Sequence, residues 1–249
     1  MPGLASELIG RRIAATDGDV GRIVDLFIDD ERWAVRYLVV ETGEWLASRH
    51  VLLSPANAVA DAPMVGPLPM ALTREQIERS PDVDTQKPVS RYHEIAHALH
   101  YGYDTYWSGS MLWGATMLPS LRHGMVPGVV PGLVRPPIGG TPPDAGVPTQ
   151  VQEAAQQAED AARRCHLRSA REIVSYHVDA SDGRLGTLDD LVVDGRSWAV
   201  PQLVVDAKPW WPGGHVRVPT ALIADIDWSG RVLRLQCSRD EVSKEPANS

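Results

Sequence analysis

The stretch WAVRYLVVE at residues 33–41 decides the fold of this chain, because it recurs as WAVPQLVVD at residues 198–206. The two stretches lie 165 positions apart, and the same offset aligns their surroundings without a gap. From residue 17 to residue 56, 16 of 40 positions are identical to those of 182–221. Unrelated segments would match at roughly one position in fifteen. The sequence therefore predicts an internal duplication.

Both copies have the residue pattern of β-structure. Trp, Val and Leu dominate the two quoted stretches and suit a pleated, half-buried surface. Leu68, Met70 and Leu72 alternate with other residues at strict period two, which places their side chains on one face of a strand. Several short strands in about 75 residues predict a small barrel, because closure removes exposed edges. The predicted fold class is mainly β, with two tandem small antiparallel β-barrels, short helices and a Pro/Gly-rich linker.

Composition divides the rest of the chain. The segment from about Ser90 to His100 is expected to be helical, and residues 124–149 carry Pro or Gly every few positions. Such a composition predicts an extended linker with little regular structure. The predicted organisation is a first barrel at 5–81, a helical and aromatic tail at 82–123, the linker at 124–149, a polar helix at 150–167 and a second barrel at 168–246.

Each barrel is expected to end in a short helix. Thr73 and Ser238 stand at matching positions, with Gln76 and Glu241 three residues later. This is the capping-box pattern, in which two side chains satisfy the free N–H groups of the first helical turn.

Acidic residues that recur in both copies are given a structural interpretation. Asp17-Gly18 and Asp182-Gly183 predict tight turns, because glycine adopts positive φ without strain. Asp25 and Asp190 also match, and they are expected at strand ends or on solvent-facing positions. A catalytic site duplicated intact in both halves would be unusual, so these carboxylates are not expected to be catalytic.

The order of these motifs resembles the PRC-barrel family. The resemblance rests on Asp17-Gly18-x-x-Gly21-x-Ile23-x-Asp25, on the stretch that begins at Trp33, and on Leu72-Thr73-Arg74-Glu75-Gln76, with matching blocks in the second copy. It implies a barrel that binds partners, as in the cytoplasmic domain of the photosynthetic reaction-centre H subunit and the C-terminal domain of the ribosome maturation factor RimM. The chain shows neither the membrane helix of the former nor the N-terminal domain of the latter, so neither specific function is expected to carry over.

A zinc-site motif supplies the strongest enzymatic alternative. His93-Glu94-Ile95-Ala96-His97 fits H-E-x-x-H, which on a helix places two imidazoles on one face with the glutamate as general base. His100 lies on nearly the same face and is the candidate third ligand. The pattern fixes only three positions, so chance matches are common, and the preferred interpretation is a partly exposed amphipathic helix. A zinc-dependent hydrolase therefore remains the alternative function.

Aromatic residues are the candidate interaction residues. They gather in a Gly- and Ser-rich segment and in a second loop: Tyr101, Tyr103, Tyr106, Trp107 and Trp113, then Trp210 and Trp211. Trp and Tyr combine a large apolar area with a polar tip, which suits interfaces. The first group is expected to pack across the barrels, within one chain or in a homodimer, with a foreign partner as the alternative.

Composition narrows the function further. The net charge is −8, from 32 acidic and 24 basic residues. A phosphate-binding footprint is therefore not expected, and an RNA or ribosome assembly factor is the third interpretation, after the scaffold and the hydrolase. Two unrelated cysteines and the lack of a signal-like apolar run favour the cytoplasm, with peripheral membrane association still open. No cofactor loop or Cys-based zinc pattern occurs. We predict a non-enzymatic interaction or scaffolding protein, associated with a membrane or electron-transport complex, whose protein partner the sequence does not identify.

Overall fold

The computed structural model describes residues 2–62, 65–81, 89, 91–124, 166–208 and 214–244. The predicted linker at 124–149 and the predicted helix at 150–167 fall almost entirely outside these residues. Within them the chain is mainly β, with two sheets and short helices, as the sequence predicts.

Barrel 1 is built on one curled sheet in the order β5-β4-β3-β2-β6. All of its neighbours are antiparallel except β2 and β6, which run parallel. The capping box at Thr73 is confirmed, because its side chain and that of Gln76 each accept from the other residue's backbone N–H. The elements are β2 (Arg12–Ala15), β3 (Gly18–Asp29), β4 (Ala34–Thr42), η1 (Glu44–Leu46), β5 (His50–Leu53), η2 (Pro55–Asn57), β6 (Leu68–Pro69) and α2 (Arg74–Glu78).

Barrel 2 repeats this plan in the order β11-β10-β9-β8-β13-β12, again with one parallel pair, β8 and β13. Strand β10 begins directly after Pro201, whose missing N–H would interrupt the ladder. Ser238 and Glu241 form the second capping box. The elements are β8 (His177–Ala180), β9 (Gly183–Asp194), β10 (Gln202–Asp206), β11 (His215–Pro219), η4 (Thr220–Leu222), β12 (Ile223–Asp227), β13 (Val232–Leu235) and α6 (Arg239–Lys244).

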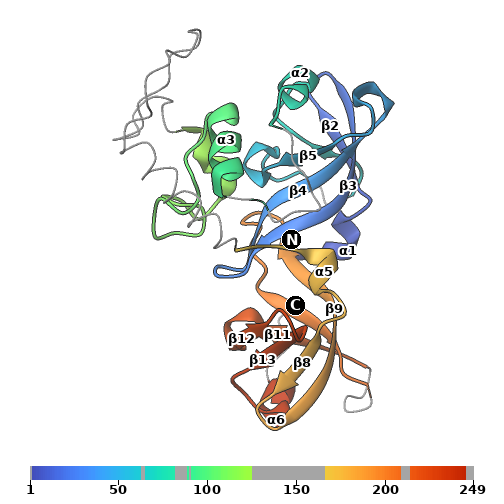
Figure 1. Cartoon of the computed structure of the whole chain (residues 1–249), viewed down its shortest axis with the longest axis vertical. Helices are drawn as coiled ribbons and strands as arrows, with labels where there is room; N and C mark the ends of the chain where they lie inside the picture. Colours follow the sequence, from blue (N-terminus) through green and yellow to red (C-terminus); the bar gives the residue numbers. More distant parts are fainter. Residues whose placement is uncertain are drawn as a thin grey trace, which may run out of the picture.

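The segment that precedes each barrel packs on the other barrel (Figure 1). Strand β1 (Pro2–Leu4) pairs with β9 and is followed by helix α1 (Ala5–Leu8), whereas β7 (Leu167–Ser169) pairs with β3 and is followed by α5 (Ala170–Ile173). The two registers are equivalent. Gly3 faces Val193 and Arg168 faces Ile28, and the 165-residue offset relates Gly3 to Arg168 and Ile28 to Val193. The barrels therefore exchange their first strand and helix reciprocally.

A short seam lies on the pseudo-twofold axis of this exchange. Ala34 and Ala199 form an antiparallel bridge, and on either side Val35 N–H donates to the Trp198 carbonyl at 2.8 Å and Val200 N–H to the Trp33 carbonyl at 2.6 Å. One continuous cluster of buried apolar side chains runs through both barrels. The two barrels thus form a single packed body.

The tail covers the outer face of barrel 1. Helix α3 (Arg91–Tyr101) confirms the helix expected there, and η3 (Pro119–Gly124) follows it. Beneath α3 lies a second apolar cluster that includes Tyr37 and Leu52. The matching positions of barrel 2 are Gln202 and Arg217, so only barrel 1 presents an apolar outer face there. No described helix is both long and apolar enough to cross a membrane.

Candidate interaction site at the seam between the barrels

Two matched carboxylates anchor the exchanged segments. Asp190 accepts from the Ser6 backbone N–H at 3.2 Å and from the Ser6 hydroxyl, and Asp25 accepts from the Arg171 N–H at 3.2 Å and from the Ser169 hydroxyl. The solvent-facing role expected for them is wrong, because the carboxylates receive the first turns of α1 and α5 from the opposite barrel. Burial raises the pKa of Asp25.

A fully buried arginine ties the tail to barrel 1. Arg36 donates to Asp29 Oδ2 through Nε at 3.0 Å and Nη2 at 2.7 Å, and its third donor, Nη1, reaches the Leu112 carbonyl at 2.6 Å. The guanidinium also lies 4.0 Å from the Tyr106 ring centroid and 4.8 Å from that of Trp113. A buried ion pair needs such additional partners to offset the desolvation of both charges.

The tail segment that contacts Arg36 also contacts barrel 2. Arg32 Nη1 donates to the Met111 carbonyl at 2.6 Å and Nη2 to the Gly109 carbonyl at 3.0 Å. Trp113 Nε1 donates to the Ser197 carbonyl in the β9–β10 turn at 2.7 Å. The aromatic segment therefore bridges the two barrels within one chain.

The H-E-x-x-H residues hold α3 against barrel 1. His97 is buried, with Nε2 2.7 Å from the Leu52 carbonyl and Nδ1 2.5 Å from the Tyr103 hydroxyl. Since a carbonyl can only accept, Nε2 carries a proton, and in the neutral ring Nδ1 accepts from the Tyr103 hydroxyl. Glu94 is also buried and accepts from the Tyr106 hydroxyl at 2.7 Å. These bonds leave the His97 lone pair directed at a hydroxyl instead of at a vacant metal position.

The other two candidate ligands, His93 of the motif and His100 beyond it, do not converge on His97. His93 is exposed, and His100 Nε2 lies 2.8 Å from the Gln76 carbonyl at the end of barrel 1. Among the described residues no group of three or more His, Cys, Asp or Glu side chains could hold a metal ion.

The aromatic candidates have different degrees of burial. Tyr103, Tyr106 and Trp113 are buried, whereas Tyr101 and Trp107 are half-buried against the core. Burial raises the pKa of Tyr101 to about 12. Trp210 and Trp211 lie outside the described residues, so their interaction role stays a prediction.

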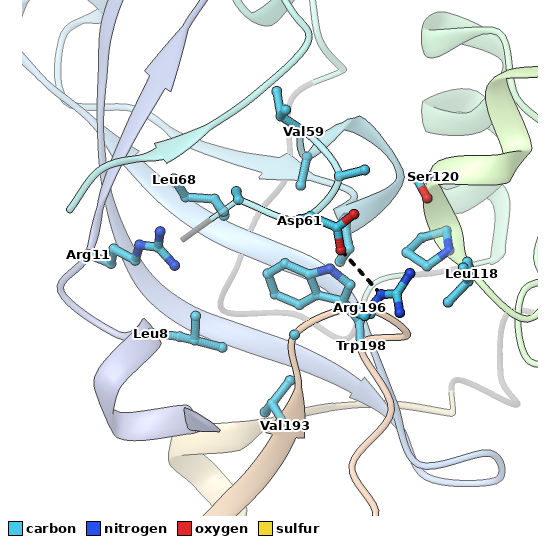
Figure 2. Close-up of a pocket in the computed structure, with 16 residues that line it drawn as sticks. Leu8, Arg11, Val59, Asp61, Leu68, Leu118, Ser120, Val193, Arg196 and Trp198 are labelled. Carbon is cyan, nitrogen blue, oxygen red and sulfur yellow. Dashed lines mark ion pairs between the residues drawn. The ribbon is translucent and has the colours of Figure 1, made fainter. Parts of the chain in front are cut away.

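The seam carries a pocket on its tail side. This tail-side pocket is a cavity of about 50 Å³, crossed by an ion pair between Arg196 and Asp61 at 3.2 Å (Figure 2). The tail forms one of its walls. The lining residues are Leu8, Arg11, Pro55, Ala58, Val59, Ala60, Asp61, Ala62, Leu68, Leu118, Pro119, Ser120, Val193, Gly195, Arg196 and Trp198.

An open cleft of about 570 Å³ lies between the β3–β4 turn of barrel 1 and β12 of barrel 2. Eight of its positions are the 165-residue equivalents of residues that line the tail-side pocket, so the two hollows are related by the pseudo-twofold axis. The residues that line the open cleft are Asp30, Glu31, Arg32, Trp33, Thr220, Ala221, Ile223, Ala224, Asp225, Ile226 and Trp228. Sequence reasoning missed both hollows, although the repeat of Trp33 as Trp198 supplies a lining residue to each.

Comparison with known proteins agrees with this architecture. Residues 4–62 match the model of the PRC-barrel domain. The match begins at Leu4, the last residue of β1, and extends past β5 and η2. No curated protein matches the chain significantly. Residues 4–62 are therefore similar to the PRC-barrel domain.

Proposed function

We propose that this chain is a non-enzymatic scaffold that joins partner proteins through surfaces on its paired barrels. One observation carries the proposal: the strongest catalytic motif in the sequence is used for packing, since His97 and Glu94 bond to Tyr103 and Tyr106 in the tail. PRC-barrel domains are in general interaction modules, which supports the same role. The most open hollow at the seam is bounded by a β-strand and by tryptophans, the features of a protein contact.

Within this role we propose a partner in a membrane-associated or electron-transport complex, reached from the cytoplasm by peripheral contact. The family resemblance supports this proposal. The net charge of −8 supports a protein partner over RNA, because phosphate contacts depend on clustered Lys and Arg.

The test begins with chemical cross-linking in cells, followed by identification of the linked protein and reconstitution from two purified components. We expect a defined stoichiometry by light scattering and a dissociation constant that His93→Ala leaves unchanged, because His93 is exposed on α3. The rival hydrolase predicts one zinc per chain, lost in His93→Ala together with peptide hydrolysis. That result would overturn the scaffold.

A further inference from the structure

The backbone of the two barrels does not decide which leading segment docks on which barrel. The leading segments are β1 with α1, and β7 with α5. Their registers on β9 and β3 are equivalent, and Asp190 and Asp25 cap the two helices in the same way. Side chains must therefore distinguish the exchanged arrangement from a parent-docked arrangement, in which each segment would pack on its own barrel.

The parent-docked arrangement is within reach of the connecting residues. Gly10 and Ser175 follow the two helices, and both have positive φ, 91° and 80°. The Gly10 N–H donates to the Ile23 carbonyl and the Ser175 N–H to the Leu188 carbonyl, both at 2.7 Å. Each of these carbonyls stands two positions before the capping aspartate of the same strand. Each segment thus leaves its own barrel beside the carboxylate that caps the other segment.

Apolar packing distinguishes the two segments. Leu167 of β7 is buried in the apolar cluster on the outer face of barrel 1, together with Tyr37 and Leu52. The equivalent residue of β1 is Pro2, and the positions that match Tyr37 and Leu52 are polar in barrel 2. Leu167 therefore fits the edge of β3 better than Pro2 does, and it gains less on barrel 2.

Charge distinguishes them as well. Arg168 Nε donates to Asp30 Oδ2 at 3.1 Å, and His166 places one ring nitrogen 3.2 Å from Asp30 and the other 3.2 Å from Glu31. The Asp30 side chain is only 11% exposed, and burial raises its pKa, a rise that Arg168 and His166 oppose. The Arg168 guanidinium also lies 4.1 Å from the ring centroid of Trp228 in the β12–β13 turn. This largely desolvated carboxylate therefore depends on the basic residues of β7.

The reciprocal edge has a different character. Gly3 stands where β7 has Arg168, so β1 brings no cation to that position. On barrel 2, Gly195 and Arg196 occupy the positions of the two acids. Docking of β7 on its own barrel would remove the ion pair with Asp30 and bring Arg168 toward Arg196, which has the same charge.

We propose that Leu167, with the basic residues His166 and Arg168 on either side, directs β7 to the edge of β3 and thereby selects the exchanged arrangement over the parent-docked one. The selection is a property of this chain's own edges and is independent of the scaffold function. It makes a single chain a defined pair of barrels.

The first test moves the distinguishing side chains from one segment to the other in the full chain. The variant carries Pro2→Leu, Gly3→Arg, Leu167→Pro and Arg168→Gly. We expect the parent-docked arrangement, because β1 then carries the residues that fit the edge of β3. Nuclear Overhauser contacts between backbone protons report the change, since residue 3 faces Val193 in the exchanged arrangement and would face Ile28 in the other. The control, Leu167→Ile with Arg168→Lys, keeps the chemistry and should keep the contact with Val193.

Hydrogen exchange gives a second readout that does not require the rearranged chain to fold. The Asp30 N–H donates to the His166 carbonyl at 2.9 Å, so its protection reports the docking of β7. Arg168→Glu should raise the exchange rate of this amide about tenfold, equivalent to roughly 1.4 kcal/mol. Adding Asp30→Lys should restore protection to within about threefold, after correction for the intrinsic rate. Arg184→Glu breaks an exposed ion pair with Asp179 and should leave the rate within about twofold.

Three results would overturn the inference. One is a contact between residue 3 and Val193 that the four-position variant retains, within one chain or between two. Another is the loss of this contact without a new one to Ile28, because the exchanged side chains would then stabilise β7 without directing it. The last is a failure of Asp30→Lys to restore protection in Arg168→Glu, and this result decides alone if the four-position variant does not fold.

Discussion

At the scale of single residues, the seam depends on two strained tryptophans. A left-handed conformation costs a bulky residue about 1–2 kcal/mol, yet Trp33 and Trp198 both adopt it. The conformation directs each carbonyl at the opposite barrel, where Val200 and Val35 donate to it. Two hydrogen bonds of about 1 kcal/mol each and the burial of Trp198 offset the strain.

Matched glycines allow neighbouring strands to approach closely, β3 against β4 and β9 against β10. A Cβ on Gly21 would lie 2.0 Å from the Glu41 carbonyl oxygen, and one on Gly186 would lie 2.0 Å from that of Asp206. We expect Gly21→Ala to lower the free energy of unfolding by about 1–3 kcal/mol, because β3 and β4 must move apart. The control is Gly43→Ala, where the nearest atom is a Trp45 ring carbon at 3.6 Å. Urea unfolding measures both, and equal losses would contradict the steric explanation.

The buried arginine gives a second prediction at this scale. Arg36→Met should destabilise the fold by about 3–5 kcal/mol, because it leaves the Asp29 carboxylate buried without its cation. Adding Asp29→Asn should restore part of the loss. Arg22→Met breaks an exposed ion pair with Glu41 and should cost less than about 1 kcal/mol. Denaturant unfolding of the four proteins checks this, and an Arg36→Met loss as small as that of Arg22→Met would refute it.

At the scale of elements, the exchanged helices are held by carboxylates that act as caps. Asp25 and Asp190 each accept the backbone N–H of a residue in the first turn of the opposite unit's helix. Asp182 does the same for α6 within its own barrel, through the Arg239 N–H at 3.0 Å. The two kinds of cap differ in burial, so their responses to pH should have opposite signs.

Burial raises the Asp25 pKa above its ordinary 3.8, so the folded state holds this proton more tightly than the unfolded state. The free energy of unfolding of the wild type, taken relative to that of Asp25→Asn, should therefore decrease as the pH rises from 3.8 through the raised pKa of Asp25. For Asp182, the Arg239 N–H lowers the pKa. The wild type should therefore have a higher free energy of unfolding than Asp182→Asn above pH 3.8. This difference should be lost as the pH falls through the lowered pKa of Asp182. Unfolding curves from about pH 3 to pH 7 measure both, and equal signs would contradict the assignment.

At the scale of the whole molecule, the two barrels are one folding unit in spite of their separate sheets. Each sheet contains a strand from the other half of the chain, and the apolar core is continuous through the seam. The tail adds a third connection through Trp113 and Ser197.

Cutting the chain should therefore leave the molecule intact. A protease site inserted between Gly139 and Gly140 and then cleaved should give two fragments that co-elute at the mass of the whole chain. We expect separation only under denaturing conditions, because β1 and β7 each pair with the other fragment. The control is an uncleaved sample. At high protein concentration, the cleaved and the uncleaved protein should have the same unfolding midpoint. Fragments that separate in native buffer would show that the exchanged elements contribute little.

Local features of this fold could be predicted from the sequence, because local patterns determine them. The capping box at Thr73 and helix α3 follow from neighbouring residues. The exchange could not be predicted in this way. Because β1 and β7 occupy matching positions in similar units, docking on the parent barrel or on the other barrel satisfies the same local pattern. The difference between the apolar Leu52 and the charged Arg217, by contrast, is visible in the sequence and indicates which barrel α3 covers.

The exchange has a consequence for the order of events during synthesis. Barrel 1 ends near residue 80, but β7, the strand that completes the edge of β3, begins only at Leu167. At about 5–20 residues per second, a ribosome needs roughly 4–20 s to make the intervening chain. During that time the outer edge of β3 is exposed on the nascent chain and can accept the β7 of a neighbouring nascent chain made on the same message. Crowded polysomes should therefore produce interlocked dimers, and slower initiation should suppress them.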